Sequence, residues 1–133
     1  MAQQAAGEPG RAPARGTAVL GRYGEDLAAA HLVAGGAVLL ARNWRCREGE
    51  LDIVAQEADG TVVFCEVKTR SGTGFGEPAE AVGAVKARRL RALACRWLQD
   101  HRPPGTRELR FDVIAIVRRR GYAPELTHLR DAL

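Results

Sequence analysis

Three side chains stand out for the chemistry they could perform together: Asp52 in the segment GELDIV, and Glu66 and Lys68 in FCEVKTR. Two carboxylates that face each other across a sheet repel, and a cation between them relieves the repulsion. Mg²⁺ takes carboxylate oxygens, keeps several waters and binds phosphate, and Mn²⁺ accepts the same oxygen ligands. A lysine beside the ion can orient or activate the attacking water, or neutralise charge on a phosphorane-like transition state. These residues therefore predict metal-dependent hydrolysis of a phosphodiester.

This grouping requires a β-hairpin in one particular register. Two β-rich runs flank the turn sequence Ala-Asp-Gly that ends at Gly60, where a positive φ is expected. A three-residue loop sets Asp52 directly opposite Glu66, and Glu50 opposite Lys68. Glu66 and Lys68 then share one face because they are two residues apart. The alternative interpretation of these two residues is an ordinary salt bridge at a strand end.

The opposite face of the predicted hairpin is wholly apolar, as expected for a strand pair that covers a core. Its residues are Leu51, Ile53, Ala55, Val63, Cys65 and Val67. The face that carries the acids begins apolar at Val62 and Phe64 and becomes charged only at the far end of the strand. The predicted site therefore lies at one pole of the sheet.

The hydrophobic pattern predicts the elements around this hairpin. A helix from about residue 17 ends at the Gly35-Gly36 pair, and a strand follows over 37–45. A glycine-rich loop at 71–78 separates the hairpin from a second helix, predicted over 79–100. After the break at Pro103-Pro104-Gly105, strands are predicted over 109–117 and 124–129. The order α-β-β-β-α-β-β indicates an α/β sheet with helices packed against it. The buried stripe expected on the second helix is Val82, Val85, Leu90, Leu93, Trp97 and Leu98.

Four further residues are candidates for supporting roles. Glu25 lies on a small, apolar helix face, where a carboxylate needs a partner, or it is a solvated helix acid. Lys86 could reach a phosphate near the site, or it is a lysine at the edge of the core whose charged end reaches water. Arg70 follows Lys68 on the same strand face, and its fork suits phosphate. For Asp112 an outer position in the site is one interpretation, and structural hydrogen bonding is the favoured one.

Composition limits the class of protein. The 133 residues suffice for one domain, expected over 17–133, after a tail at 1–16 rich in Ala, Gly, Pro and Gln that is predicted to be disordered. No apolar run approaches the roughly 20 residues of a membrane helix, and no secretory signal is visible, so we expect a cytoplasmic protein without a membrane partner. The three scattered cysteines predict unpaired thiols and no structural zinc site.

The formal charge of +4 suits a polyanionic partner, and 18 of the 20 cationic residues are arginines. Arginine sets at 88–96 and 118–120 could contact phosphates, or they are plain solvated surface. Aromatic residues are only 5%, so no stacking platform for single strands is expected. No recognition helix is evident either, so binding selective for the structure of a duplex or branched substrate is favoured over sequence reading.

Several ordered motifs resemble the YraN family of small, uncharacterised bacterial proteins. They are GRYGEDLA at 21–28, NWR at 43–45, GELDIV at 49–54, FCEVKTR at 64–70, FG at 75–76 and RFDV at 110–113. Asp52 with Glu66 and Lys68 is also similar to the PD-(D/E)xK motif of restriction enzymes and Holliday-junction resolvases, although Leu51 replaces the proline. The resemblance covers residues 17–133 and implies a restriction-endonuclease-like fold, a mixed sheet between two main helices. It also implies that Glu25, on the first helix, completes a Mg²⁺ or Mn²⁺ site with Asp52 and Glu66.

Two functions follow from these observations. The first is a nuclease in which Asp52 and Glu66 bind the metal, Lys68 assists the water, and Arg70 and Lys86 contact the nucleic acid. DNA rather than RNA is the expected substrate. The alternative is a binding module for nucleic acid or a protein partner that keeps the fold and does not cut. Because so short a chain is nearly all core, a homodimer or a larger complex is a further expectation for choosing the substrate.

Overall fold

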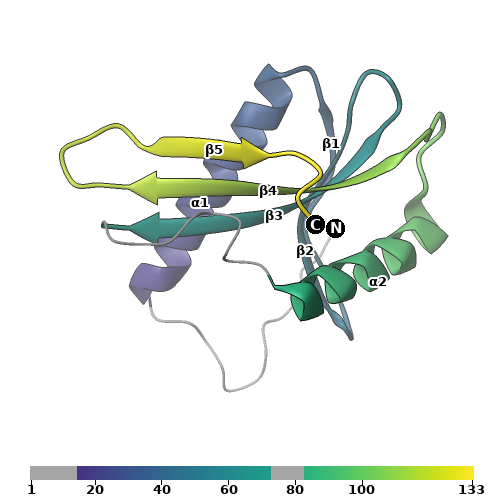
Figure 1. Ribbon diagram of the computed structural model, residues 1–133, viewed down its shortest axis with the longest axis horizontal. Coiled ribbons are helices and arrows are strands. Elements are labelled where there is room, and N and C mark those ends of the chain that lie inside the picture. Colours follow the sequence, from purple (N-terminus) through teal and green to yellow (C-terminus); the bar gives the residue numbers. More distant parts are fainter. Residues whose placement is uncertain (1–14, 73–82) are drawn as a thin grey trace.

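The computed structural model describes residues 15–72 and 83–133, and its five strands form one mixed sheet in the order β1-β2-β3-β4-β5 (Figure 1). The predicted α/β class and the order α-β-β-β-α-β-β are confirmed. The elements are α1 (Arg15–Ala34), β1 (Val38–Cys46), β2 (Gly49–Gln56), β3 (Val62–Ser71), α2 (Ala84–His101), β4 (Leu109–Arg118) and β5 (Glu125–Leu129).

The two helices cover opposite faces of the sheet, which gives the molecule two hydrophobic layers (Figure 1). Ala28, Ala29 and Leu32 of α1 pack on one face, and Leu90, Leu93 and Trp97 of α2 pack on the other. Alternation along each strand supplies both layers, because successive side chains of β3 point to opposite faces. The small residues of α1 allow that helix to approach closely. An added Cβ at Gly24 would collide with the Thr69 side chain of β3.

The β2–β3 hairpin has the predicted register. Gly60 has a φ of 97°, and the Glu57 N–H donates to the Thr61 carbonyl at 2.8 Å. Antiparallel pairing runs from Gln56–Val62 to Ile53–Cys65 and ends there. One position beyond the last pair, the Asp52 carboxylate accepts the Val67 N–H at 2.9 Å. The strands therefore separate where the predicted acids lie, and a side chain replaces the next backbone hydrogen bond of the ladder.

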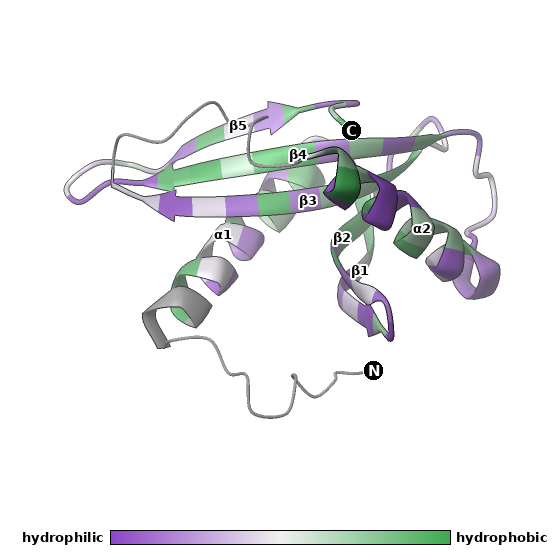
Figure 2. Ribbon diagram, turned by 60° about the horizontal axis from the view of Figure 1, so that its bottom comes forward, coloured by the Kyte–Doolittle hydropathy of each residue, from purple (hydrophilic) through white to green (hydrophobic). Residues whose placement is uncertain are grey.

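The strand β3 is the centre of the sheet and changes character along its length. It pairs with β4 in parallel, Glu66 beside Val113 and Lys68 beside Ala115, and α2 makes the crossover between these two strands. Val62 and Phe64 are fully buried under α2, whereas Arg70 at the far end is exposed. Figure 2 shows the same change from hydrophobic to hydrophilic toward the C-terminal end of β3. The polar pole lies where the sequence predicted it.

Three sequence expectations need correction. The second helix begins at Ala84 and not at residue 79, because Gly83 is extended (φ −93°, ψ 178°) and stands at its N-cap. Val85 is therefore 62% exposed on the first turn instead of lying in the buried stripe, and Val82 is outside the described residues. Leu51 packs with the α2 layer and not with Ile53, because it lies beyond the last β2–β3 pair and turns toward the second helix.

Parts of other expectations fall outside the described residues. Residues 1–14 of the predicted tail lie outside the described residues, and α1 begins at Arg15. Most of the glycine-rich loop, residues 73–78, lies outside them as well. Among the described helices, none has both the length and the apolar character that crossing a bilayer requires.

Candidate functional site

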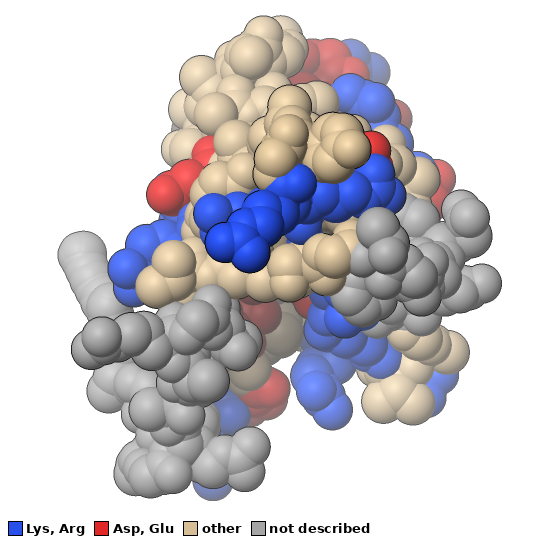
Figure 3. Space-filling model, turned by 90° about the vertical axis from the view of Figure 1, so that its left-hand side faces the viewer, with Lys and Arg blue, Asp and Glu red and all other residues tan. Residues whose placement is uncertain are grey.

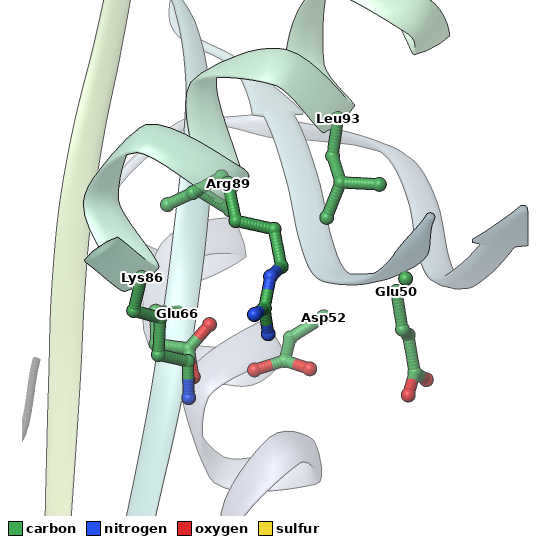
Figure 4. Close-up of a pocket in the computed structure, with 8 residues that line it drawn as sticks. Glu50, Asp52, Glu66, Lys86, Arg89 and Leu93 are labelled. Carbon is green, nitrogen blue, oxygen red and sulfur yellow. The ribbon is translucent and has the colours of Figure 1, made fainter. Parts of the chain in front are cut away.

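A cavity of about 240 Å³ opens between the first turns of α2 and the point where β2 and β3 separate. Figure 4 shows side chains from three elements directed into it: Asp52 from β2, Glu66 from β3, and Lys86 and Arg89 from α2. The complete lining is Gly49, Glu50, Asp52, Glu66, Lys86, Arg89, Leu90 and Leu93. Acids and bases thus meet in one cavity with an apolar wall, which is the setting in which charges interact strongly.

Asp52 is the most perturbed acid of this cavity. Burial and the neighbouring Glu66 carboxylate raise the pKa of Asp52 to about 7, against the lowering effect of the hydrogen bond from Val67. Glu25 and Glu50 add to the rise. A carboxyl group with this pKa is only partly ionised at neutral pH unless a cation lies beside it. Burial and the like charge of Glu66 thus disfavour the ionised form of Asp52.

Glu66 is buried, and its carboxylate forms ion pairs with both lysines of the protein. The Lys86 Nζ lies 2.7 Å from Glu66 Oε2, and the Lys68 Nζ lies 3.4 Å from the same oxygen. The ion pair between Glu66 and Lys68, which was the alternative interpretation of these residues, thus exists, and Lys86 joins it at a shorter distance. The sequence singled out these two lysines because every other cationic residue is arginine, and the structure brings both to one carboxylate.

The two lysines have different protonation properties. Burial and the adjacent Lys86 ammonium lower the pKa of Lys68. Burial also acts to lower the pKa of Lys86, but hydrogen bonds to Glu66 and Lys68 outweigh it, so that its pKa is raised. Of the two lysines, Lys86 is therefore the more firmly protonated.

Two further acids surround the cavity. Glu25 of α1 is half-buried, and burial raises its pKa against a hydrogen bond with Asn43. It is close enough to raise the pKa of Asp52, but it does not line the cavity itself. Glu50 lines the cavity, and burial raises its pKa also. Its ion pair, at 3.5 Å, is with Arg45 rather than with Lys68. The predicted Glu50–Lys68 pairing is wrong because the β2–β3 ladder ends before it.

Arg89 is the cavity residue that the sequence did not identify individually. Its guanidinium points between Asp52 and Glu66 in Figure 4. In the sequence it stands in a run of arginines on a surface helix, where each could equally be solvated. Its spacing of three from Lys86 was the available signal, because residues three apart share a helix face. Arg70 is exposed and lies outside the cavity lining.

A second polar network lies on the α1 face of β4. Asp112 is fully buried and accepts hydrogen bonds from the Arg110 guanidinium, from His128 and from the Asp131 N–H. His128 also bonds to His31 at 3.0 Å. Cys65, Asp112 and His128 form the one group of three among the described residues whose potential ligand atoms all lie within 4.8 Å of one another. The potential ligand atoms of Glu25, Asp52 and Glu66 do not all lie within this distance of one another.

The Arg110 guanidinium and the His128 ring already occupy hydrogen-bonding positions on the Asp112 carboxylate. Each Asp112 oxygen accepts at least two hydrogen bonds. The favoured interpretation of Asp112, structural hydrogen bonding, is therefore confirmed. The network attaches the C-terminal turn and α1 to the sheet.

Comparison with known proteins finds similarity over most of the chain. The model of the family described as "Uncharacterised protein family UPF0102" matches residues 24–116. A UPF0102 protein of Parafrankia sp. (strain EAN1pec) is 55% identical over 114 residues, which cover 85% of this chain and 94% of the relative. A UPF0102 protein of Acidothermus cellulolyticus is 52% identical over 122 residues, covering 85% and 92%. The matched residues include every side chain of the cavity.

Proposed function

The chain belongs to the uncharacterised protein family UPF0102, and we propose that it is a divalent-metal-dependent nuclease that hydrolyses phosphodiester bonds in DNA. The observation that carries this proposal is the cavity in which Asp52 and Glu66 approach each other beside Lys86 and Arg89. Opposed buried carboxylates are costly for a module that only binds. They are useful where a divalent cation must be held next to a phosphate.

The donor set fits Mg²⁺ or Mn²⁺. Both ions prefer hard oxygen ligands, and the cavity offers carboxylate oxygens from Asp52 and Glu66. The raised pKa of Asp52 indicates a carboxylate that gains from a neighbouring cation. Glu25 is the candidate for a third acid, acting on the cation directly or through water, because it already influences Asp52 electrostatically. When bound, the ion would act as a Lewis acid and lower the pKa of coordinated water.

The remaining residues have separable roles in hydrolysis. Water attacks phosphorus, the bond from phosphorus to one sugar oxygen breaks, and that oxygen takes up a proton. Lys68, whose pKa is lowered, orients the attacking water through its Nζ and can exchange a proton with it. Lys86, whose pKa is raised, stays protonated and binds a phosphate oxygen. Arg89 has the fork geometry to hold a second phosphate oxygen.

We propose DNA over RNA, and selection by structure over selection by sequence. The elements around the cavity are two strands at the point where they separate and the first turns of a helix, which suit contact with a backbone phosphate and do not read base edges. The short chain offers little surface beyond its core, so a homodimer or a larger complex is the proposed means of selecting the substrate.

The test is cleavage of a panel of labelled linear, nicked and branched DNAs and RNAs by purified protein with Mg²⁺ or Mn²⁺. The wild type should cut at least one DNA, EDTA should abolish cutting, and Asp52→Asn and Glu66→Gln should be inactive while folded. Asp100→Asn is the matched control, because Asp100 is an exposed acid on α2 outside the cavity. If the wild type binds DNA but cuts nothing with either metal, the protein is the non-catalytic binding module instead.

A further inference from the structure

The hairpin that joins β4 and β5 carries a basic surface separate from the cavity. Arg118 and Arg120 are exposed on it, and β3 ends beside Arg118, so the hairpin turn extends past the neighbouring strand. Figure 3 shows Lys and Arg side chains gathered in a band across this face, where β3 and β4 end and β5 begins. We call Arg118 and Arg120 the hairpin arginines.

The turn itself is well defined. The Tyr122 N–H donates to the Arg119 carbonyl at 3.1 Å, and Gly121 between them has a φ of 83°, which a β-turn of type II requires at its third position. The Arg118 guanidinium lies 5.0 Å from the centre of the Tyr23 ring, stacked on α1. Stacking limits the motion of a guanidinium without neutralising it, so its N–H groups remain suited to phosphate. The Arg118 side chain is therefore held against α1, and Arg120 lies in a turn with a defined backbone.

Arg119, between them, is different. Its guanidinium pairs with Glu125 at 2.8 Å, so its charge is already compensated. Two positions on one turn thus present net positive charge, and the position between them does not. This alternation distinguishes a specific contact surface from a general excess of arginine, and it supplies an internal control.

The hairpin arginines lie further along the sheet than the cavity and on its other face, because the cavity opens under α2 whereas Arg118 stacks on Tyr23 of α1. Val113 is beside Glu66, and Arg118 is five residues further along the same strand, a distance of roughly 16 Å at about 3.3 Å per residue. Duplex DNA covers this distance in about five base pairs, at roughly 3.4 Å each. A bound duplex would therefore contact the hairpin arginines at the end of the sheet, on the face opposite to the cavity.

We propose that the hairpin arginines bind the phosphate backbone of duplex DNA. The inference rests on the proposed function and names its substrate as duplex. A single strand is disfavoured because Tyr122 alone is exposed among the described Phe, Trp and Tyr residues. One ring is no stacking platform.

The test is the salt dependence of binding to a short duplex DNA, measured by fluorescence anisotropy in EDTA, where cutting does not interfere. Each phosphate contact contributes about 0.9 to the slope of log affinity against log salt. The double variant Arg118→Gln/Arg120→Gln should reduce this slope by roughly two and weaken binding at least tenfold at moderate salt. Arg119→Gln should change the slope little. The double variant Arg118→Lys/Arg120→Lys keeps both charges and should retain most of the wild-type slope. Circular dichroism verifies that each variant is folded.

The outcomes are distinguishable. An unchanged slope in the folded double variant would overturn the hairpin contact, and so would an equal effect of Arg119→Gln. Equal affinity for a single strand or for duplex RNA of the same length would overturn the assignment to duplex DNA. If the slopes behave as expected while no metal supports cutting, the hairpin contact stands and the proposed nuclease activity fails.

Discussion

The substitution Asp52→Asn should stabilise the protein at neutral pH in the absence of divalent metal. In the wild type, the pKa of Asp52 is about 7 in the folded state, above the ordinary value of 3.8. Between these two pH values the folded protein therefore holds a proton that the unfolded chain has released. The stability that this group contributes is fully present below pH 3.8 and is lost as the pH rises through 7. Asparagine keeps the shape and an oxygen for the Val67 N–H, and it cannot ionise.

The magnitude follows from the difference of about three pKa units. At about 1.36 kcal/mol per unit, ionising Asp52 costs the folded state up to about 4 kcal/mol above pH 7. The cavity is open to water, which screens part of the repulsion from Glu66, so we expect a gain of about 2 kcal/mol for Asp52→Asn at pH 8. At pH 4 the two proteins should differ little.

Urea unfolding followed by tryptophan fluorescence provides the measurement, between pH 4 and 8.5 in EDTA. Trp44 and Trp97 both belong to the α2 layer and report its unfolding. The difference in unfolding free energy between variant and wild type should grow as the pH rises from 4 to 7 and then level off. A variant less stable than wild type at pH 8, or a difference independent of pH, would refute the electrostatic account of the cavity. Asp100→Asn should show no such trend.

Three further results are expected. Lys68→Arg should fold normally and lose cleavage by about 100-fold or more, since the larger guanidinium cannot occupy the ammonium position or exchange a proton; wild-type rates would contradict this. Glu25→Gln should weaken Mn²⁺ binding by about tenfold in calorimetry. The control variant Asp26→Asn, which changes an exposed neighbour, should leave Mn²⁺ binding unaltered. Asp112→Asn should lower the unfolding free energy by about 3 kcal/mol in urea titrations, because it weakens the hydrogen bonds of a fully buried group and leaves the partly buried Arg110 charge with Glu57 as its remaining ion-pair partner. A neutral effect would show that the network is dispensable.

A pH effect of opposite sign is expected at His31. Burial, His128 and Arg130 lower its pKa below 6.5, so its contribution is present above pH 6.5 and is lost as the pH falls below that value. In His31→Gln the unfolding free energy should therefore depend less on pH between 5 and 7 than in the wild type. An identical pH dependence in both proteins would be inconsistent with a neutral His31 in the folded state.

The hairpin and its pole were predictable because local rules determine them. A three-residue turn ending in Gly60 fixes the register of β2 and β3, and parity then brings Glu66 and Lys68 to one face. The two helices followed from periodicity and from the glycine pair at 35–36. The family resemblance agreed with these local signals, and the comparisons confirm it.

What the sequence did not reveal depends on tertiary contacts. The separation of β2 from β3 beyond Ile53–Cys65 moved Leu51 to the α2 layer and left Glu50 paired with Arg45, and no local pattern marks where a ladder stops. The entry of Arg89 into the cavity depends on the angle at which α2 crosses the sheet. The late start of α2 was foreseeable in part, since glycine is a poor helix residue and Gly83 interrupts the predicted first turn.

The most direct test of the central claim is a calorimetric titration of Mn²⁺ into the wild type, Asp52→Asn and Asp100→Asn, each in the presence of a short duplex DNA. We expect saturable metal binding by the wild type and by Asp100→Asn, and its loss in Asp52→Asn although that variant remains folded and bound to DNA. If the wild type binds no metal, or if Asp52→Asn binds it equally well, the carboxylates of the cavity are not a metal site and the proposed nuclease mechanism is wrong.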